Sequence, residues 1–179
     1  MVNITANGPT TFCQQDSVTL TSSIANSYLW STGKTTQSIV VKASGNYNVS
    51  VTDGNGCSAA AGAPVTVTVN PLPMVTITAN GPTTFCQQDS VVLTSSAAAS
   101  YLWGTGETTQ SVMVKTSGNY NVTVTDVNGC SAAASSPVAV TVNPLPVVTI
   151  TADNPTTFCQ ADSVTLTSSI ADTYLWTTG

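Results

Sequence analysis

The sequence predicts an all-β protein made of tandem antiparallel β-sandwich modules, and three observations lead to this prediction. One passage of the chain is written three times. Within each copy, apolar and polar residues alternate with a period of two, which is typical of strands with one buried face. Short clusters of Gly, Asn and Pro separate these runs, and no useful stretch has the 3.6-residue period of a helix. We expect about seven strands in each module and an end-to-end, rod-like arrangement of the modules.

The repeat is 73 residues long. The passage FCQQDSVTLTSS starts at Phe12 and returns, with small changes, at Phe85 and Phe158. The first two copies align without a gap and are identical at 59 of 73 positions, whereas the third copy matches only the first 33 positions of the unit. Such a period indicates an array of similar domains. The predicted units are 1–73, 74–146 and 147–179, the last being the front half of a module, and we expect the array to continue beyond Gly179.

The alternation places the strands and the core of each module. In the first unit, Val18 and Leu20 alternate with threonines, and turn residues such as those of DGNG at 53–56 end the runs. The expected strands are 2–6, 10–13, 17–23, 27–31, 37–42, 46–52 and 58–69. The aromatic residues expected in the cores are Trp30, Tyr47, Trp103, Tyr120 and Trp176. The VNPLP segment that ends each full unit has two prolines in four residues, which predicts a short and stiff connection.

Composition argues against several classes of function. The chain has three Lys, no Arg, no His and eight carboxylates, for a net charge of −5. Nucleic-acid binding depends on cationic side chains against phosphates, so we expect no nucleic-acid partner. No apolar run approaches the roughly 18 residues of a spanning helix, so we expect no membrane insertion. Without His, paired carboxylates or a phosphate loop, we expect neither an enzyme nor a cofactor. We also expect no metal site, because the turn with Asp53 and Asn55, which could offer oxygen ligands to calcium, has only one carboxylate.

Five cysteines follow the repeat. The spacing from Cys13 to Cys57 and from Cys86 to Cys130 is 44 residues in both units, which predicts one disulfide per module. Cys159 aligns with Cys13, and its expected partner lies beyond the chain end. Disulfides persist in oxidising compartments, so the pairing predicts an extracellular location. The alternatives are buried free thiols and, with less support because no CxxC pair exists, a metal site.

The residues of each full module resemble a known family. The stretch SYLWSTGKTTQSIVVKASGNYNVSVTDGNGCSAAA, and its second copy, is similar to the Ig-like repeat of very large surface proteins from gliding Gram-negative bacteria. The resemblance covers both full units and the front half of the third. Its most specific part runs from Trp30 through Gly45 and Tyr47 to Cys57, and recurs from Trp103 to Cys130. One departure from antibody domains is that Cys57 follows Tyr47 by ten residues, so we expect the bridge near one end of the sandwich.

This resemblance implies a function. It implies a tandem Ig-like fold similar to PKD and fibronectin type III sandwiches, export by a type IX secretion system, and display as an adhesin or filament of the SprB kind. Asp-Ser-Val occurs once per unit and resembles the O-glycosylation signal of these bacteria, although a strand start explains the same residues. The candidate acceptors are Ser17, Ser90 and Ser163.

The principal hypothesis is therefore a structural repeat region of an extracellular surface adhesin or filament, which provides length, stiffness and display for adhesion or gliding motility. The expected partners are neighbouring repeats of the same chain, with other copies in a filament and surface glycans as further candidates. One alternative is that the modules are spacers or carbohydrate-binding modules of a secreted multidomain enzyme. Another is that each module binds a glycan itself.

Overall fold

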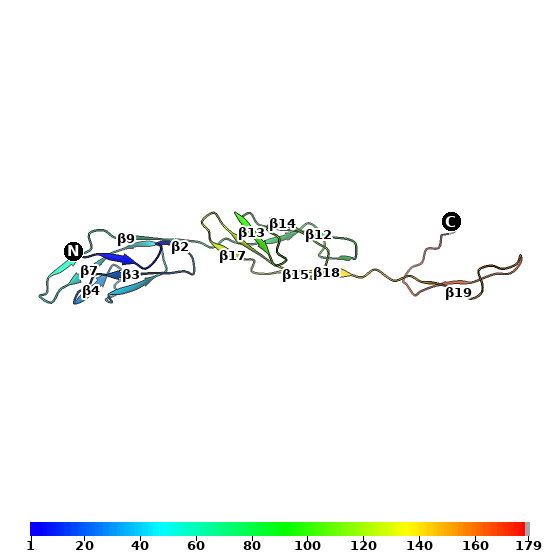
Figure 1. Ribbon diagram of the computed structural model, residues 1–179, viewed down its shortest axis with the longest axis horizontal. Coiled ribbons are helices and arrows are strands. Elements are labelled where there is room, and N and C mark those ends of the chain that lie inside the picture. The colour runs from blue at the N-terminus through cyan, green and yellow to red at the C-terminus, as the bar shows by residue number, and fades with distance from the viewer. Residues whose placement is uncertain (178–179) are drawn as a thin grey trace.

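The computed structural model describes residues 1–177, so that the last two residues of the third predicted unit, 178–179, lie outside the described residues. All regular elements in this described part are β-strands, and the first and second repeats follow one another along an elongated molecule (Figure 1). The fold is thus confirmed as all-β, with tandem β-sandwich modules. The first repeat (1–73) contains β1 (Ile4–Ala6), β2 (Thr11–Cys13), β3 (Val18–Ser22), β4 (Ser27–Trp30), β5 (Ser38–Val41), β6 (Gly45–Tyr47), β7 (Val49–Thr52), β8 (Ser58–Ala60) and β9 (Val65–Asn70).

The second repeat (74–146) has the same elements in the same order. They are β10 (Ile77–Ala79), β11 (Thr84–Cys86), β12 (Val91–Ser95), β13 (Ser100–Trp103), β14 (Ser111–Val114), β15 (Gly118–Tyr120), β16 (Val122–Thr125), β17 (Ser131–Ala133) and β18 (Val138–Asn143). Within its described residues, 147–177, the third repeat forms only β19 (Ile150–Ala152) and β20 (Leu166–Ser168), which pair with each other.

Each complete repeat is a sandwich of two layers. In the first repeat, one layer is the antiparallel sheet β1-β3-β5. The other layer consists of β2-β9-β6 and β4-β7-β8, in which β2 runs parallel to β9 and the remaining pairs are antiparallel. The same orders, β10-β12-β14, β11-β18-β15 and β13-β16-β17, recur in the second repeat. No strand of one repeat pairs with a strand of another in the described chain, so each sandwich is closed by its own residues.

Two of the seven expected strands are interrupted. The expected strand 46–52 divides at Asn48 into β6, which pairs with β9, and β7, which pairs with β4 and β8. The Asn48 side chain there accepts a hydrogen bond from the backbone N–H of Val49 at 2.8 Å, which replaces a ladder bond. The expected strand 58–69 divides into β8 and β9 at the Gly62–Pro64 segment, because proline has no N–H to donate to a ladder.

The core of each repeat lies between its two layers and is centred on one tryptophan. Trp30 is only 2% exposed, and its indole N–H donates to the carbonyl oxygen of Thr36 at 2.8 Å. Tyr47 is 9% exposed, and its hydroxyl donates to the carbonyl oxygen of Ala43 at 2.9 Å, so its polar end is satisfied. The residues packed around them are Val18, Leu20, Ile39, Val41, Val49, Ala61 and Val67. In the second repeat, Trp103 and Tyr120 are buried in the same way.

The third repeat departs from the prediction for its tryptophan. Trp176 was expected in a core, but it is 51% exposed. In the first repeat the equivalent Trp30 packs with residues of β5 and β7, and the given sequence does not include the positions equivalent to those strands. The third repeat therefore has the beginning of a core without the second half of the sandwich, and its apolar side chains remain open to solvent.

Acid is expected to loosen the β19–β20 pair and leave its counterparts unchanged. The backbone N–H of Thr165 donates to the Asp153 carboxylate at 2.9 Å, and this bond is the main reason that the pKa of Asp153 lies below its ordinary value of 3.8. A depressed pKa means that the stabilising bond is present above the ordinary value and is lost as the pH falls through the folded pKa. The equivalent acceptors are Asn7 and Asn80, which do not titrate.

The measurement is amide hydrogen exchange of Thr165, with the equivalent amide of Thr19 as the internal reference, between about pH 5 and about pH 2. We expect protection of Thr165 relative to Thr19 to decrease on acidification. Asp153→Asn should remove this difference, since it restores the acceptor of the other repeats. If the protection of Thr165 relative to Thr19 did not change with pH in the unsubstituted chain, the stabilising role given to the Asp153 carboxylate would be contradicted.

Candidate functional site: the junction between repeats

The most specific chemical feature of the chain is a disulfide that joins the first two repeats. Cys13 is bonded to Cys130, with their Cα atoms 5.5 Å apart and 117 residues between them in sequence. The predicted pairs Cys13–Cys57 and Cys86–Cys130 are therefore wrong in this structure. Cys57, Cys86 and Cys159 are exposed free thiols. We call the contact built around Cys13 and Cys130 the junction.

The two cysteines of one repeat cannot meet because they lie at opposite ends of its sandwich. Cys13 ends β2 beside Asn70 at the end of β9, whereas Cys57 follows the turn that joins β7 to β8. The strand run from Gly45 to Thr52 lies between these two ends, and its seven steps of roughly 3.3 Å place the ends about 23 Å apart. A disulfide requires Cα atoms within about 7 Å, so the expected bridge inside one repeat is excluded by strand geometry.

Local hydrogen bonds hold Cys130 in place. It follows a turn in which the Asp126 carboxylate accepts from the backbone N–H groups of Asn128 and Cys130, each at 2.9 Å. The backbone N–H of Asp126 donates in turn to the carbonyl oxygen of Cys130 at 2.9 Å. Gly129 has a φ of +80°, a conformation that glycine adopts without the steric cost of a side chain. The DVNG turn at 126–129, the counterpart of DGNG at 53–56, thus presents the sulfur atom of Cys130 at one end of the second repeat.

The other cysteine is positioned by the end of a strand pair. Cys13 lies opposite Asn70 in the parallel β2–β9 ladder, and the N–H of the next residue, Gln14, donates to the carbonyl oxygen of Asn70 at 2.8 Å. The N–H of Asp16 then donates back to the carbonyl oxygen of Cys13 at 3.1 Å, which closes a tight turn with Gln15 at a φ of 87°. Both cysteines of the disulfide therefore lie in backbone segments that hydrogen bonds hold in place.

The junction also buries side chains that are exposed where no neighbour is present. Cys130 is fully buried, whereas the equivalent Cys57 is exposed. Val124 is 1% exposed, whereas its equivalent Val51 is only half-buried. The local sequences are nearly identical, so the difference reflects what lies against them. The end of the second repeat that carries β17 faces the end of the first repeat that carries β2 and β9 (Figure 1).

The first repeat contributes the VNPLP connection to the same contact. Leu72 and Pro73 are half-buried at the junction. Their equivalents after the second repeat, Leu145 and Pro146, are exposed, with Leu145 at 41%. The difference indicates that the proline-rich connection is part of the interface between the two sandwiches. Apolar burial and a covalent bond both restrict bending at this point.

A groove beside β5 of the first repeat is a weaker candidate for a binding site. It has a volume of about 570 Å³, and its lining includes Lys34, Lys42 and Tyr47. The second repeat has Glu107 in place of Lys34, so the charge at this position is reversed from one repeat to the next. The groove is therefore not a recurrent site along the array.

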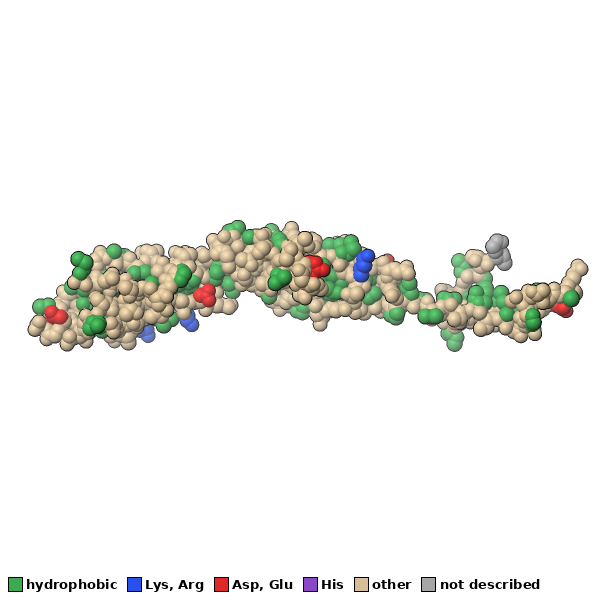
Figure 2. Space-filling view, in the orientation of Figure 1, with side chains coloured by type: hydrophobic (Ala, Val, Ile, Leu, Met, Phe, Trp, Pro, Cys, Tyr) green, Lys and Arg blue, Asp and Glu red, His purple; other side chains and the backbone are tan. Residues whose placement is uncertain are grey.

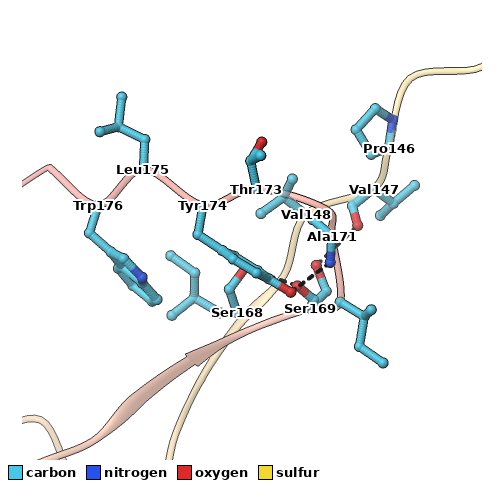
Figure 3. A pocket seen from close by; sticks show the side chains of 12 residues that line it. Pro146, Val147, Val148, Ser168, Ser169, Ala171, Thr173, Tyr174, Leu175 and Trp176 are labelled. Carbon is cyan, nitrogen blue, oxygen red and sulfur yellow. Dashed lines mark hydrogen bonds between the residues drawn. The ribbon is translucent and has the colours of Figure 1, made fainter.

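A hollow of about 250 Å³ in the third repeat is the open side of its incomplete core. Val148, Ile150, Tyr174 and Trp176 line it, together with further apolar residues (Figure 3). The Tyr174 hydroxyl accepts from the N–H of Ala171 at 2.7 Å, a bond that Tyr28 makes to Ala25 in the first repeat. The Tyr174 hydroxyl therefore has the same structural role as the Tyr28 hydroxyl of a complete repeat, and the hollow does not resemble a ligand pocket.

The candidate O-glycosylation sites lie where a sugar could be attached. Ser17, Ser90 and Ser163 are all exposed, and Ser17 directly precedes β3. The preceding Asp16 takes part in the turn after Cys13, as Asp89 does after Cys86. The strand-start explanation of the Asp-Ser-Val sequence therefore holds for the backbone, and modification of the hydroxyls remains a prediction.

Other functional groups are sparse. Within residues 1–177, no three His, Cys, Asp or Glu side chains gather in a way that could hold a metal ion. No helix in the same range is long and apolar enough to cross a bilayer. Charged side chains are few and scattered over the visible face, most of which is uncharged (Figure 2). The junction is thus the feature on which a functional argument can be built.

Comparisons with known proteins do not assign a family. No protein family matches the sequence, and no curated protein matches it. Among solved structures, the three N-terminal domains of the bacteriophage RB49 outer capsid protein Hoc match with 18% identity and a TM-score of 0.39, over 95% of this chain and 69% of that chain. A 1.5-MDa bacterial ice-binding adhesin matches with 20% identity and a TM-score of 0.41, over 84% and 68%. Murine CEACAM1b matches with 15% identity and a TM-score of 0.35, over 81% and 100%. At these identities and TM-scores we draw no functional argument from the likeness.

Proposed function

We propose that the chain is a structural repeat region of an extracellular bacterial surface adhesin or filament, in which it provides length, stiffness and display. The observation that supports this most directly is the junction, where a disulfide and a packed proline-rich connection join consecutive sandwiches. Besides its effect on stability, such a bond restrains the two modules relative to one another. A chain that must transmit force or hold a fixed reach would gain resistance to bending and to separation of its modules.

The location and the finer assignment belong to the same proposal. A disulfide between repeats favours an oxidising, extracellular setting. The module units 1–73, 74–146 and 147–179, the type IX export route and the SprB-like gliding adhesin are supported by the sequence resemblance described above. Surface glycans, neighbouring repeats and other copies of the chain are the proposed partners. We propose that the chain is not itself an enzyme.

The alternative is that the repeats are spacer or carbohydrate-binding modules of a secreted multidomain enzyme. In that case the stiff junction would hold a neighbouring catalytic domain at a fixed distance. The experiment that separates the two is peptide mapping of the intact parent protein, sheared from the surface of cells that make it. We expect many tandem copies and a terminal anchoring or secretion domain. Two or three copies joined to a catalytic domain would instead support the spacer. Binding of the 179-residue chain on a glycan array would favour a direct carbohydrate-binding role, and a silent array would count against it.

A further inference from the structure

The two outer ends of the pair of repeats each carry one half of a junction: a cysteine equivalent to Cys13 or to Cys130 that forms no disulfide. The junction joins the first cysteine of one repeat, Cys13, to the second cysteine of the next, Cys130. Cys86 is the first cysteine of the second repeat, and Cys57 is the second cysteine of the first repeat; both are exposed free thiols. Because the two ladders and turns repeat, each free thiol has the geometry of one half of the existing bridge.

The turn that presents Cys57 is already formed. The Asp53 carboxylate accepts from the N–H groups of Asn55 and Cys57 at 2.9 Å each, as Asp126 does at the junction. The N–H of Asp53 donates to the carbonyl oxygen of Cys57 at 2.9 Å, and Gly56 has a φ of +81°. This end of the first repeat differs from its counterpart at the junction mainly in being uncovered.

The strand end that presents Cys86 is formed as well. Cys86 lies opposite Asn143 in the parallel β11–β18 ladder, as Cys13 lies opposite Asn70. The N–H of Gln87 donates to the carbonyl oxygen of Asn143 at 2.7 Å, and the N–H of Asp89 donates to the carbonyl oxygen of Cys86 at 3.1 Å. The exposed Leu145 adjoins this end, where the equivalent Leu72 is half-buried.

We propose that Cys57 and Cys86 are half-sites for further disulfides of the same kind, and that the partner of each is another module of this repeat. Cys57 takes the first cysteine of a preceding module, and Cys86 takes the second cysteine of a following module. Every junction of an array is then closed by a bond with a 117-residue separation. In such an array, each module is joined by a disulfide to the module before it and to the module after it. The proposal depends on the tandem structure and not on the surface role proposed above.

Bond formation is an oxidation and needs an acceptor for electrons. The two thiols lose two protons and two electrons as the S–S bond forms, and oxidised glutathione accepts both to give two reduced glutathione molecules. The step proceeds by attack of a thiolate on a disulfide sulfur, followed by exchange of the mixed disulfide. Cys57 and Cys86 are both exposed, so both are open to this exchange before a neighbouring module covers them.

The first test adds a complete module before Met1. The variant carries a second copy of residues 74–146 ahead of the full 179-residue chain and is folded in a glutathione redox buffer. In the parent chain a thiol reagent should label Cys57, Cys86 and Cys159 in the folded protein. In the extended chain we expect complete loss of Cys57 labelling, and peptide mapping should find Cys57 bonded to the added counterpart of Cys86. The matched control replaces that added cysteine by serine, which should restore labelling of Cys57.

The second test works at the other end and has its own measure of folding. The chain is extended after Gly179 with a copy of residues 107–146, which completes the third module. Burial of Trp176, seen as a blue shift of its fluorescence, reports that the added residues have folded. We expect Cys86, and not Cys159, to bond to the added counterpart of Cys130.

The two tests have clear contrary outcomes. A bond between the added cysteine and Cys159 would show pairing inside a module and would overturn the proposal. Continued labelling of Cys57 in the first extended chain would do so as well, as would Cys57–Cys57 dimers. If Trp176 stays exposed in the second variant, the first variant decides, since its added module is complete. Peptide mapping of the intact parent protein tests the surface role separately. The disulfide pairings of the two extended variants do not depend on what the repeats are attached to.

Discussion

Replacing Trp30 by alanine is expected to lower the free energy of unfolding of the first repeat by about 3–5 kcal/mol. Trp30 is the largest buried side chain of that repeat and lies between its two layers. Its removal leaves a cavity and also leaves the carbonyl oxygen of Thr36 without the indole N–H that donates to it. A small sandwich has a narrow margin of stability, so a loss of this size should unfold much of the first repeat at room temperature.

The measurement is urea unfolding followed by far-UV circular dichroism, with amide exchange to assign the transition to one repeat. Leu29→Ala is the matched control, because Leu29 is the neighbour of Trp30 on β4 and is 57% exposed. We expect the control to remain within about 0.5 kcal/mol of the parent chain. Trp103→Ala should produce the same loss in the second repeat. Equal effects of Trp30→Ala and Leu29→Ala would contradict the assigned core.

Removing the junction disulfide is expected to have the second largest effect. Replacing both Cys13 and Cys130 by serine should lower the free energy of unfolding of the repeat pair by about 2–4 kcal/mol, because the bridge restricts the unfolded chain over 117 residues. The same change should increase bending between the two sandwiches, since only the packed connection then restrains them. The expected readouts are an earlier urea transition and a smaller radius of gyration by X-ray scattering in solution.

Serine at the equivalent free thiols is the control for this change. Cys57→Ser together with Cys86→Ser alters the same residue types in the same local structures, but it removes no bond. We expect this control to match the parent chain in both measurements. A double variant of Cys13 and Cys130 that behaved like the control would show that the bridge contributes neither stability nor stiffness. Reduction of the parent chain should reproduce the effect of the Cys13 and Cys130 variant.

The period-two pattern predicted most of the strands because the alternation of burial is a local property of a pleated chain. Val18 and Leu20 point into the core, and the threonines between them do not, as expected for β3. The interruptions at Asn48 and at Gly62–Pro64 were missed, although proline was a usable signal for the second. At Asn48 the strand changes partner while the alternation of Tyr47 and Val49 continues unbroken, so the pattern held no sign of it.

The sequence by itself determined the repeat, most of the strands, the all-β class and the residues at the centre of the two complete cores. All of these depend on neighbours within one module, and the pattern of apolar residues reports them. It also indicated a disulfide, and the one that forms joins a first cysteine, Cys13, to a second cysteine, Cys130. The sequence could not determine which cysteines pair, because Cys130 has a first cysteine 44 residues before it and another 117 residues before it, and the repeat makes both equally regular.

Only the tertiary structure decided the pairing. The sandwich places the two cysteines of one repeat at opposite ends, and the short connection brings the far end of the first repeat against the near end of the second. The exposure of Trp176 has the same kind of cause: its side chain is apolar and correctly spaced, but a core forms only where the opposite layer is present to cover it. Pairing and burial are relations between distant segments, and a local pattern does not contain them.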